Sequence, residues 1–128
     1  MTTAKTTDEL SRINDLIHDY WFDIEDAVFD AQVGVVTLPF TRPAQDQERA
    51  RAFRRSEVPD RRFFLKIYHV KRWVVEDRQR VGLYDFNEVV YEPSSRSIKI
   101  TTGIPIHLVA EVEDLEVSVE EAGGALSS

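Results

Sequence analysis

The sequence predicts an α+β domain in which an N-terminal helix precedes about six mostly antiparallel strands, arranged as a strongly bent sheet or a partly open barrel. Apolar residues recur at helical spacing only near the N-terminus, and runs rich in β-branched and aromatic residues fill most of the remainder. One late run changes its alternation midway. The 128 residues, 42% apolar and 30% charged, suit a single domain spanning 1–128.

A helix is predicted over residues 8–18, with Thr7 as its N-terminal cap and two acids, Asp8 and Glu9, where the helix dipole favours them. With Thr7 as the cap, Glu9 is one residue short of the capping-box position. Four apolar residues share one face of this helix: Leu10, Ile13, Leu16 and Ile17.

The stretch HDYWFDIEDAVFD, residues 18–30, combines acids with large apolar side chains. From Phe22 onward it reads as a strand with Phe22, Ile24 and Val28 on the buried face. Asp23 and Glu25 then face water, and Asp26 breaks the alternation, so a bend or bulge is predicted near residues 25–26.

Two hairpins are predicted from an internal echo. Val-Phe-Asp at 28–30 and Val-Thr-Leu at 36–38 flank five residues, as do Val-Tyr-Glu at 90–92 and Ile-Lys-Ile at 98–100. Pro93-Ser94-Ser95 is a turn signal in the second copy, and Gly34 is predicted in or just after the turn of the first.

Residues 41–60 are predicted to form a polar, Arg-rich excursion, with 44–55 left open as helix or coil. Residues 62–76 form the longest β-favouring run and are predicted to be one central strand covered on both sides. Strands are also expected at 83–92, at 97–102 and after Pro105.

The last run places apolar residues at even positions up to Val112 and at odd positions from Leu115. A single change of parity exchanges the buried and exposed faces of a strand, so a bulge or corner is predicted at 113–114. Residues 121–128 are predicted to be a frayed tail.

Charge is segregated along this acidic chain, whose net charge is −7. Residues 42–80 hold 12 Lys and Arg against 6 acids, whereas the rest holds 4 against 17. This basic middle either neutralises its acidic neighbours in the fold or binds an acidic partner or a nucleic acid. Aromatic residues are interspersed with the basic ones in this segment, a combination that suits the binding of single-stranded nucleic acid. These residues are Phe53, Phe63, Phe64, Tyr68 and Trp73.

Several classes of protein are disfavoured. The chain has no cysteine, which excludes disulfides, thiol catalysis and zinc–thiolate sites. It has no phosphate-binding loop, dinucleotide fingerprint, nucleophile elbow or HExxH motif, and no cofactor is expected. No apolar run has membrane-spanning length and no secretory signal is evident, so a cytoplasmic location is expected.

An enzyme is the alternative reading. A metal site could draw on His18, Asp19, His69 and His107, although no two histidines have the spacing of a prebuilt pair. Acid/base catalysis could use a carboxylate, but no single candidate stands out among Asp23, Glu25, Asp26, Glu111 and Glu113. The alternative to both kinds of site is that the carboxylates face solvent and the histidines serve packing or surface hydrogen bonds.

Leu16-Ile17-His18-Asp19 at the helix end and Val112-Glu113-Asp114-Leu115-Glu116-Val117 near the C-terminus resemble small uncharacterised bacterial β-rich domains, some of them similar to immunity proteins of toxin systems. The resemblance implies a binding role and transfers no site.

The leading hypothesis is a non-catalytic protein-interaction module. Arginine and aromatic residues are common interface anchors, and those expected to contact the partner are Arg49, Arg51, Arg54, Arg55, Arg61, Arg62 and Trp73. A metal-dependent or carboxylate-based enzyme and nucleic-acid binding through the basic middle are the alternatives. The oligomeric state is left open.

Overall fold

A computed structural model describes residues 2–18, 20–41, 63–76, 83–104 and 106–121. Within these residues the chain forms one α-helix and ten strands in two antiparallel sheets. The predicted excursion at 41–60 lies outside the described residues except for Thr41, and the predicted tail lies outside them beyond Glu121.

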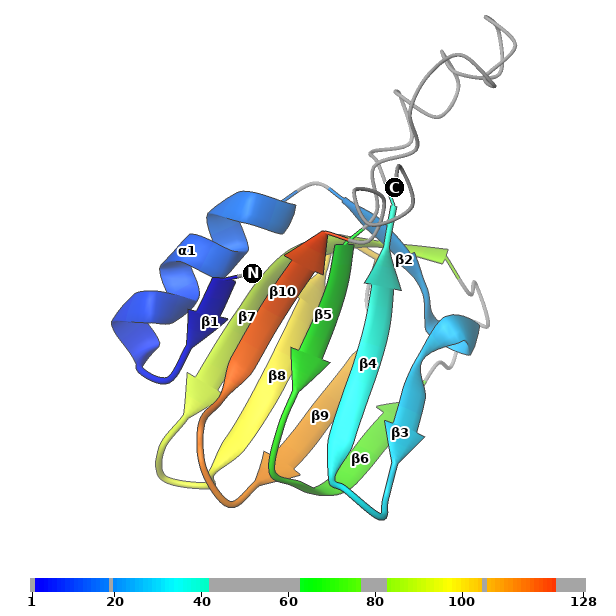
Figure 1. Cartoon of the computed structure of the whole chain (residues 1–128). Coiled ribbons are helices and arrows are strands. Elements are labelled where there is room, and N and C mark those ends of the chain that lie inside the picture. The colour runs from blue at the N-terminus through cyan, green and yellow to red at the C-terminus, as the bar shows by residue number, and fades with distance from the viewer. Residues whose placement is uncertain (1, 19, 42–62, 77–82, 105, 122–128) are drawn as a thin grey trace, which may run out of the picture.

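The first sheet, in front in Figure 1, contains in order β1 (Thr2–Ala4), β10 (Val117–Glu121), β5 (Phe63–Ile67), β4 (Val35–Phe40) and β3 (Val28–Asp30). The second sheet, behind it, contains in order β2 (Trp21–Asp23), β7 (Leu83–Glu92), β8 (Ser97–Thr102), β9 (His107–Val112) and β6 (Val70–Glu76). The helix α1 (Thr7–Ile17) lies beside β1 and β7.

The predicted helix is confirmed with its start and end shifted by one residue. Thr6, rather than Thr7, is the cap, and its hydroxyl accepts a hydrogen bond from the Glu9 amide at 3.2 Å. Glu9 therefore occupies the capping-box position, and its carboxylate accepts a hydrogen bond from the Lys5 amide at 2.7 Å. Leu10, Ile13 and Ile17 are buried, whereas Leu16 is 40% exposed.

Asn14 docks the helix onto the second sheet. Its side-chain Oδ1 accepts a hydrogen bond from the Val89 amide at 2.7 Å, and its Nδ2 donates to the Val89 carbonyl at 3.2 Å. Along β7, the three residues of β2 pair with Leu83, Tyr84 and Asp85. On its other side, Trp21 of β2 exchanges two backbone hydrogen bonds with Thr41, at 2.8 and 3.1 Å. The Asn14 amide thus satisfies the β7 backbone at a point that β2 does not reach.

The change of parity at 113–114 marks a real corner. The chain leaves β9 in the second sheet and enters β10 in the first, and Val112, Leu115 and Val117 are all buried. The facing run bends at the same level, because the Glu113 amide donates to the His69 carbonyl at 2.9 Å. Two long bent ribbons therefore join the sheets.

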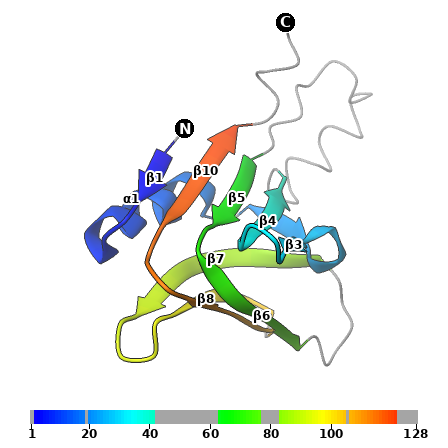
Figure 2. The same ribbon diagram turned by 60° about the horizontal axis from the view of Figure 1, so that its bottom comes forward.

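The prediction that residues 62–76 form one continuous strand covered on both sides is wrong. The run is divided at Tyr68–His69 into β5 in the first sheet and β6 in the second, and Figure 2 shows the chain turning between them. His69, at this bend, takes a positive φ of 60°, in the left-handed region that residues with a Cβ rarely adopt. The outward residues Phe64, Lys66 and Tyr68 are only partly buried, so β5 is fully covered on one face only.

The acidic stretch is confirmed as β structure with a bend. The helix ends at Ile17, and β2 and β3 follow, separated by the one-turn 3₁₀ helix η1 (Ile24–Asp26). Phe22 and Ile24 are buried as predicted, but Val28 is 60% exposed. The turn η1 restarts the alternation, so Val28 faces away from the core.

Both predicted hairpins are present. Val28 to Asp30 pair with Val35 to Thr37, and Gly34 closes that turn with a φ of 71°. β7 pairs with β8 from Phe86 to Glu92. The count of about six strands is wrong: three of the six predicted runs are each divided by a bend, and β1 is an additional short strand.

The core lies between the sheets and is almost entirely apolar in the described part of the chain. Four aromatic rings connect the two sheets, with centroids 5.1–6.1 Å apart: Phe22, Phe40, Tyr84 and Phe86. Among the described residues, the buried polar side chains are Ser97 and Ser118. The same residues contain no helix with the length and apolar character needed to cross a membrane.

Candidate functional site

Trp73 is the one predicted partner-binding residue that the structure describes. It lies in β6, packed against the edge of the core and partly buried. The six arginines predicted to accompany it lie outside the described residues: Arg49, Arg51, Arg54, Arg55, Arg61 and Arg62. The candidate binding surface in the described part of the chain is therefore centred on Trp73 and β6.

β6 forms an edge of the second sheet. It pairs with β9 on one side only. At its first residue the Val70 amide donates to the Gly34 carbonyl at 2.9 Å, and beyond that point no described strand pairs with its outer side. β6 has seven residues, whereas the other edge strands β1, β2 and β3 have three each. β6 is therefore the longest edge in the described part of the chain. Because short edge strands limit the addition of another strand, β6 is the edge most open to it.

The direction of the β6 backbone groups follows from those of β9. The Val112 amide donates to the Arg96 carbonyl at 2.9 Å, which directs Val112 toward the β8 side. Backbone groups alternate sides along a strand, so Glu111, Val109 and His107 point toward β6 and their partners there point back. Trp73 and Val75 consequently direct their N–H and C=O groups away from the sheet.

The side chains along β6 differ on its two faces. Trp73 and Val75 share the face of their buried partners Ala110 and Leu108, and Val75 is still 39% exposed. Arg72, Val74 and Glu76 occupy the opposite, outer face by alternation.

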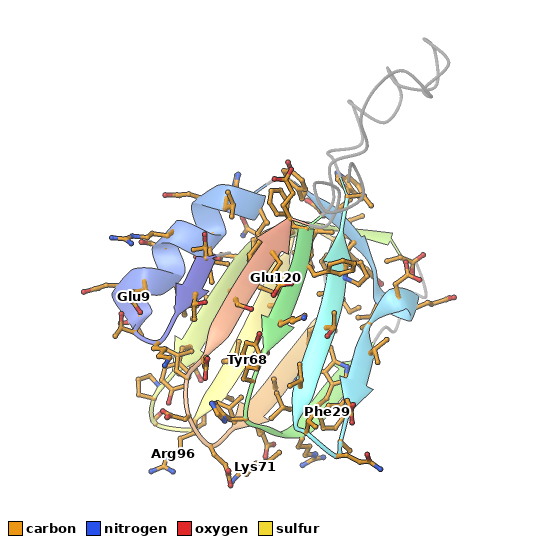
Figure 3. All side chains as sticks on the ribbon, viewed as in Figure 1. Glu9, Phe29, Tyr68, Lys71, Arg96 and Glu120 are labelled. Atoms are coloured by element: carbon orange, nitrogen blue, oxygen red, sulfur yellow. The ribbon has the colours of Figure 1, made fainter. Side chains whose placement is uncertain are left out.

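The outer face carries one exposed ion pair and one exposed contact between a carboxylate and a histidine. Arg72 lies 3.7 Å from a Glu111 oxygen, and Glu76 lies 3.9 Å from Nε2 of His107. Figure 3 places Lys71, also exposed, near the end of the molecule where β5 turns into β6. The strand thus has a basic beginning, an apolar middle and an acidic end.

The predicted metal ligands are not gathered at one place where the structure describes them. His69 contacts Glu116 at 2.8 Å beside the start of β6, and His107 faces Glu76 at the other end. Six residues of strand separate these positions, or about 20 Å. Among the described residues no group of three or more potential ligands could hold a metal ion. His18 caps α1, and Asp19 lies outside the described residues.

The candidate acid/base carboxylates all lie at the surface. Glu25, Asp26 and Glu113 are exposed, and Asp23 and Glu111 are partly buried. Asp23 has a local structural role, since its Oδ1 accepts a hydrogen bond from the Glu25 amide at 2.9 Å and caps η1. The two buried serines are hydrogen-bonded, Ser97 to Ser95 and Ser118 to Tyr68.

Nucleic-acid binding through the basic middle stays a prediction. Only three of its twelve basic residues are described, and two of these have acidic neighbours: Lys66 lies 3.8 Å from Glu120, and Arg72 lies beside Glu111. Of the five interleaved aromatics, Phe63 is buried in the core. Phe64, Tyr68 and Trp73 are partly buried, and Phe53 lies outside the described residues.

The sequence gives no sign that β6 is an edge, because this property depends on the order of strands in a sheet. What could be recognised is the composition: Lys71 to Val75 combine basic and large apolar residues, as interfaces do.

Comparison of the chain with protein families, with curated proteins and with solved structures finds no match. No family membership follows, and the function has to be argued from the geometry of the chain itself.

Proposed function

We propose that this protein is a non-catalytic interaction module that binds an extended segment of a polypeptide along the outer edge of β6. The observation that carries the proposal is an edge strand of seven residues whose outer side pairs with no described strand after Val70. A segment added there gains main-chain hydrogen bonds from the outward groups of Trp73 and Val75, while side chains on both faces supply specificity.

The side chains of β6 also support the proposal, because they add apolar contact area to the open backbone edge. A partly buried tryptophan beside a half-exposed valine offers apolar area at a position where the strand is open. The bulge between Val70 and Arg72 confines the regular part of the edge to residues 72–76. An added strand of about five residues therefore matches the available ladder.

The proposal is tested with a library of short extended peptides screened against the purified protein, followed by amide hydrogen exchange on each complex. Bound peptides are expected to slow the exchange of the Trp73 and Val75 amides, because both become hydrogen-bond donors. The amides of β6 that already face β9 should change little.

Val75→Pro is the matched variant. It removes an outward N–H without touching the ladder to β9, so it should abolish peptide binding while the protein still folds. Val75→Thr, which keeps the amide and the branched side chain, is the control and should bind normally. Peptide binding that survives Val75→Pro with its affinity unchanged would contradict the proposal.

A further inference from the structure

We infer that the segment which occupies the β6 edge is β6 of a second copy of this chain, paired antiparallel about a two-fold axis at Val74. The inference rests on the proposed function, because it names the occupant of the same edge. It follows from the order of residues in the regular part of the strand, Arg72-Trp73-Val74-Val75-Glu76.

The charge pattern is complementary to itself in this register. Antiparallel pairing centred on Val74 sets Arg72 of each copy opposite Glu76 of the other. Oppositely charged residues directly across a strand pair stabilise it, whereas like charges destabilise it. Arg72 and Glu76 are exposed, and their contacts within the chain are long, at 3.7 and 3.9 Å. Both side chains can therefore take part in an additional pair.

The apolar residues fall into place in the same register. Trp73 of each copy faces Val75 of the other, and Val74 faces its own counterpart. The half-exposed Val75 side chain is then covered by a tryptophan on the face that borders the core.

The backbone satisfies the same register. Trp73 and Val75 direct their N–H and C=O groups outward, so each Trp73–Val75 pair exchanges two hydrogen bonds across the axis. Val74 turns its own groups toward β9, which makes the central position a non-hydrogen-bonded pair. In such a pair the two Cα atoms lie about 4.5 Å apart. The two second sheets would join into one continuous sheet through β6.

The small contact area of an edge pair predicts a weak dimer that depends on protein concentration. Sedimentation velocity over a wide range of concentrations is expected to show a monomer that converts reversibly to a dimer. Arg72→Glu alone and Glu76→Arg alone should each weaken dimerisation about tenfold, since each places like charges together at both ends. The double variant should dimerise as the natural chain does.

A cysteine cross-link fixes the register. The chain has no cysteine, so Val74→Cys carries a single thiol. The predicted Cα separation falls within the range of about 4.4–6.8 Å that a disulfide spans, and oxidised glutathione should convert this variant to a covalent dimer. Val109→Cys is the matched control, because residue 109 pairs with Val74 on β9. Its two copies would lie three strand spacings apart, roughly 14 Å, and should not cross-link.

The outcomes separate the two proposals. A chain that stays monomeric at every concentration, with no cross-link through Val74→Cys, would overturn the two-fold pairing. The same result together with peptide binding that Val75→Pro abolishes would leave the proposed function standing. A dimer unaffected by Arg72→Glu and by Val75→Pro would place the interface elsewhere and overturn the pairing. Circular dichroism melting of each variant shows that every comparison is made on folded protein.

Discussion

His69 Nε2 lies 2.8 Å from Oε1 of Glu116, and this contact joins the two bends through which the sheets share their strands. The Tyr68 amide donates to the Glu116 carbonyl at 3.0 Å, and the Glu113 amide donates to the His69 carbonyl at 2.9 Å. The corner is thus held by backbone bonds in both directions and by one side-chain contact. It determines where the chain leaves β5 in the first sheet and begins β6, an edge strand of the second.

The backbone of His69 lies in the left-handed region, with φ at 60°. A residue with a Cβ pays about 1–2 kcal/mol there, and glycine does not. His69→Ala and His69→Gly both lose the Glu116 contact, so they differ chiefly in this penalty. We expect His69→Gly to be the more stable of the two by about 1 kcal/mol in urea denaturation. At an ordinary strand position the order is reversed, so a more stable alanine variant would contradict the corner geometry.

Gly34 supports the same corner from the β3–β4 turn. Its φ is 71°, and a Cβ there would lie 3.1 Å from the Val70 carbonyl oxygen. Gly34→Ala should therefore lower the free energy of unfolding by about 1–2 kcal/mol or more. Asparagine tolerates the left-handed region better than most residues with a Cβ. Gly34→Asn should therefore lower the free energy of unfolding by less than the size of its side chain suggests. Wild-type stability in the alanine variant, measured by thermal melting, would count against the close approach of Gly34 and Val70.

Asn14 is the polar link between the helix and β7. Asn14→Ala leaves the amide and carbonyl of Val89 without their partner, and each unsatisfied buried group costs about 1–3 kcal/mol. Both hydrogen bonds are only part-buried, so water replaces some of the lost bonding, and we expect a total loss of unfolding free energy of about 1–3 kcal/mol. Asn14→Asp, which keeps an acceptor for the Val89 amide but lacks the donor, should lose less. Asp15→Ala, at the exposed neighbouring position, is the control and should change stability little.

Gly103 and Asp85 form a coupled pair. A Cβ on Gly103 would overlap an Asp85 carboxylate oxygen, and the same carboxylate accepts a hydrogen bond from the Ile104 amide at 3.1 Å. Gly103→Ala should displace the Asp85 side chain and cost about 1 kcal/mol through that hydrogen bond. In an Asp85→Ala background the same substitution should cost much less. A double-mutant cycle measures the coupling, and strictly additive effects would show that the two residues do not interact.

Local signals in the sequence identified much of the fold. The helix was predicted within one residue at each end, since its apolar spacing and its acids are local. The 83–92 and 97–102 hairpin was predicted correctly because a Pro-Ser turn separates two β-favouring runs. The corner at 113–114 was predicted because apolar residues alternate strictly on both sides of it.

The bend at His69 could not be predicted from the sequence, for a physical reason. Phe64 in β5 and Tyr68 just after it face outward, and Val74 and Val75 occupy both faces of β6. Large apolar residues at consecutive positions hide a change of parity, and the positive φ of a histidine has no sequence signal. The docking of Asn14 and the edge position of β6 depend on contacts between distant segments, which spacing along the chain does not reveal.

Residue-resolved amide exchange along β6 tests the central claim, that the outer edge of this strand is the binding edge. In dilute protein the amides of Trp73 and Val75 should exchange fast while that of Val74 exchanges slowly, since only the latter donates to β9. At high protein concentration, or with a bound peptide, all three should be slow. Fast exchange at Trp73 and Val75 under every condition, or slow exchange at both in dilute protein, would contradict the account.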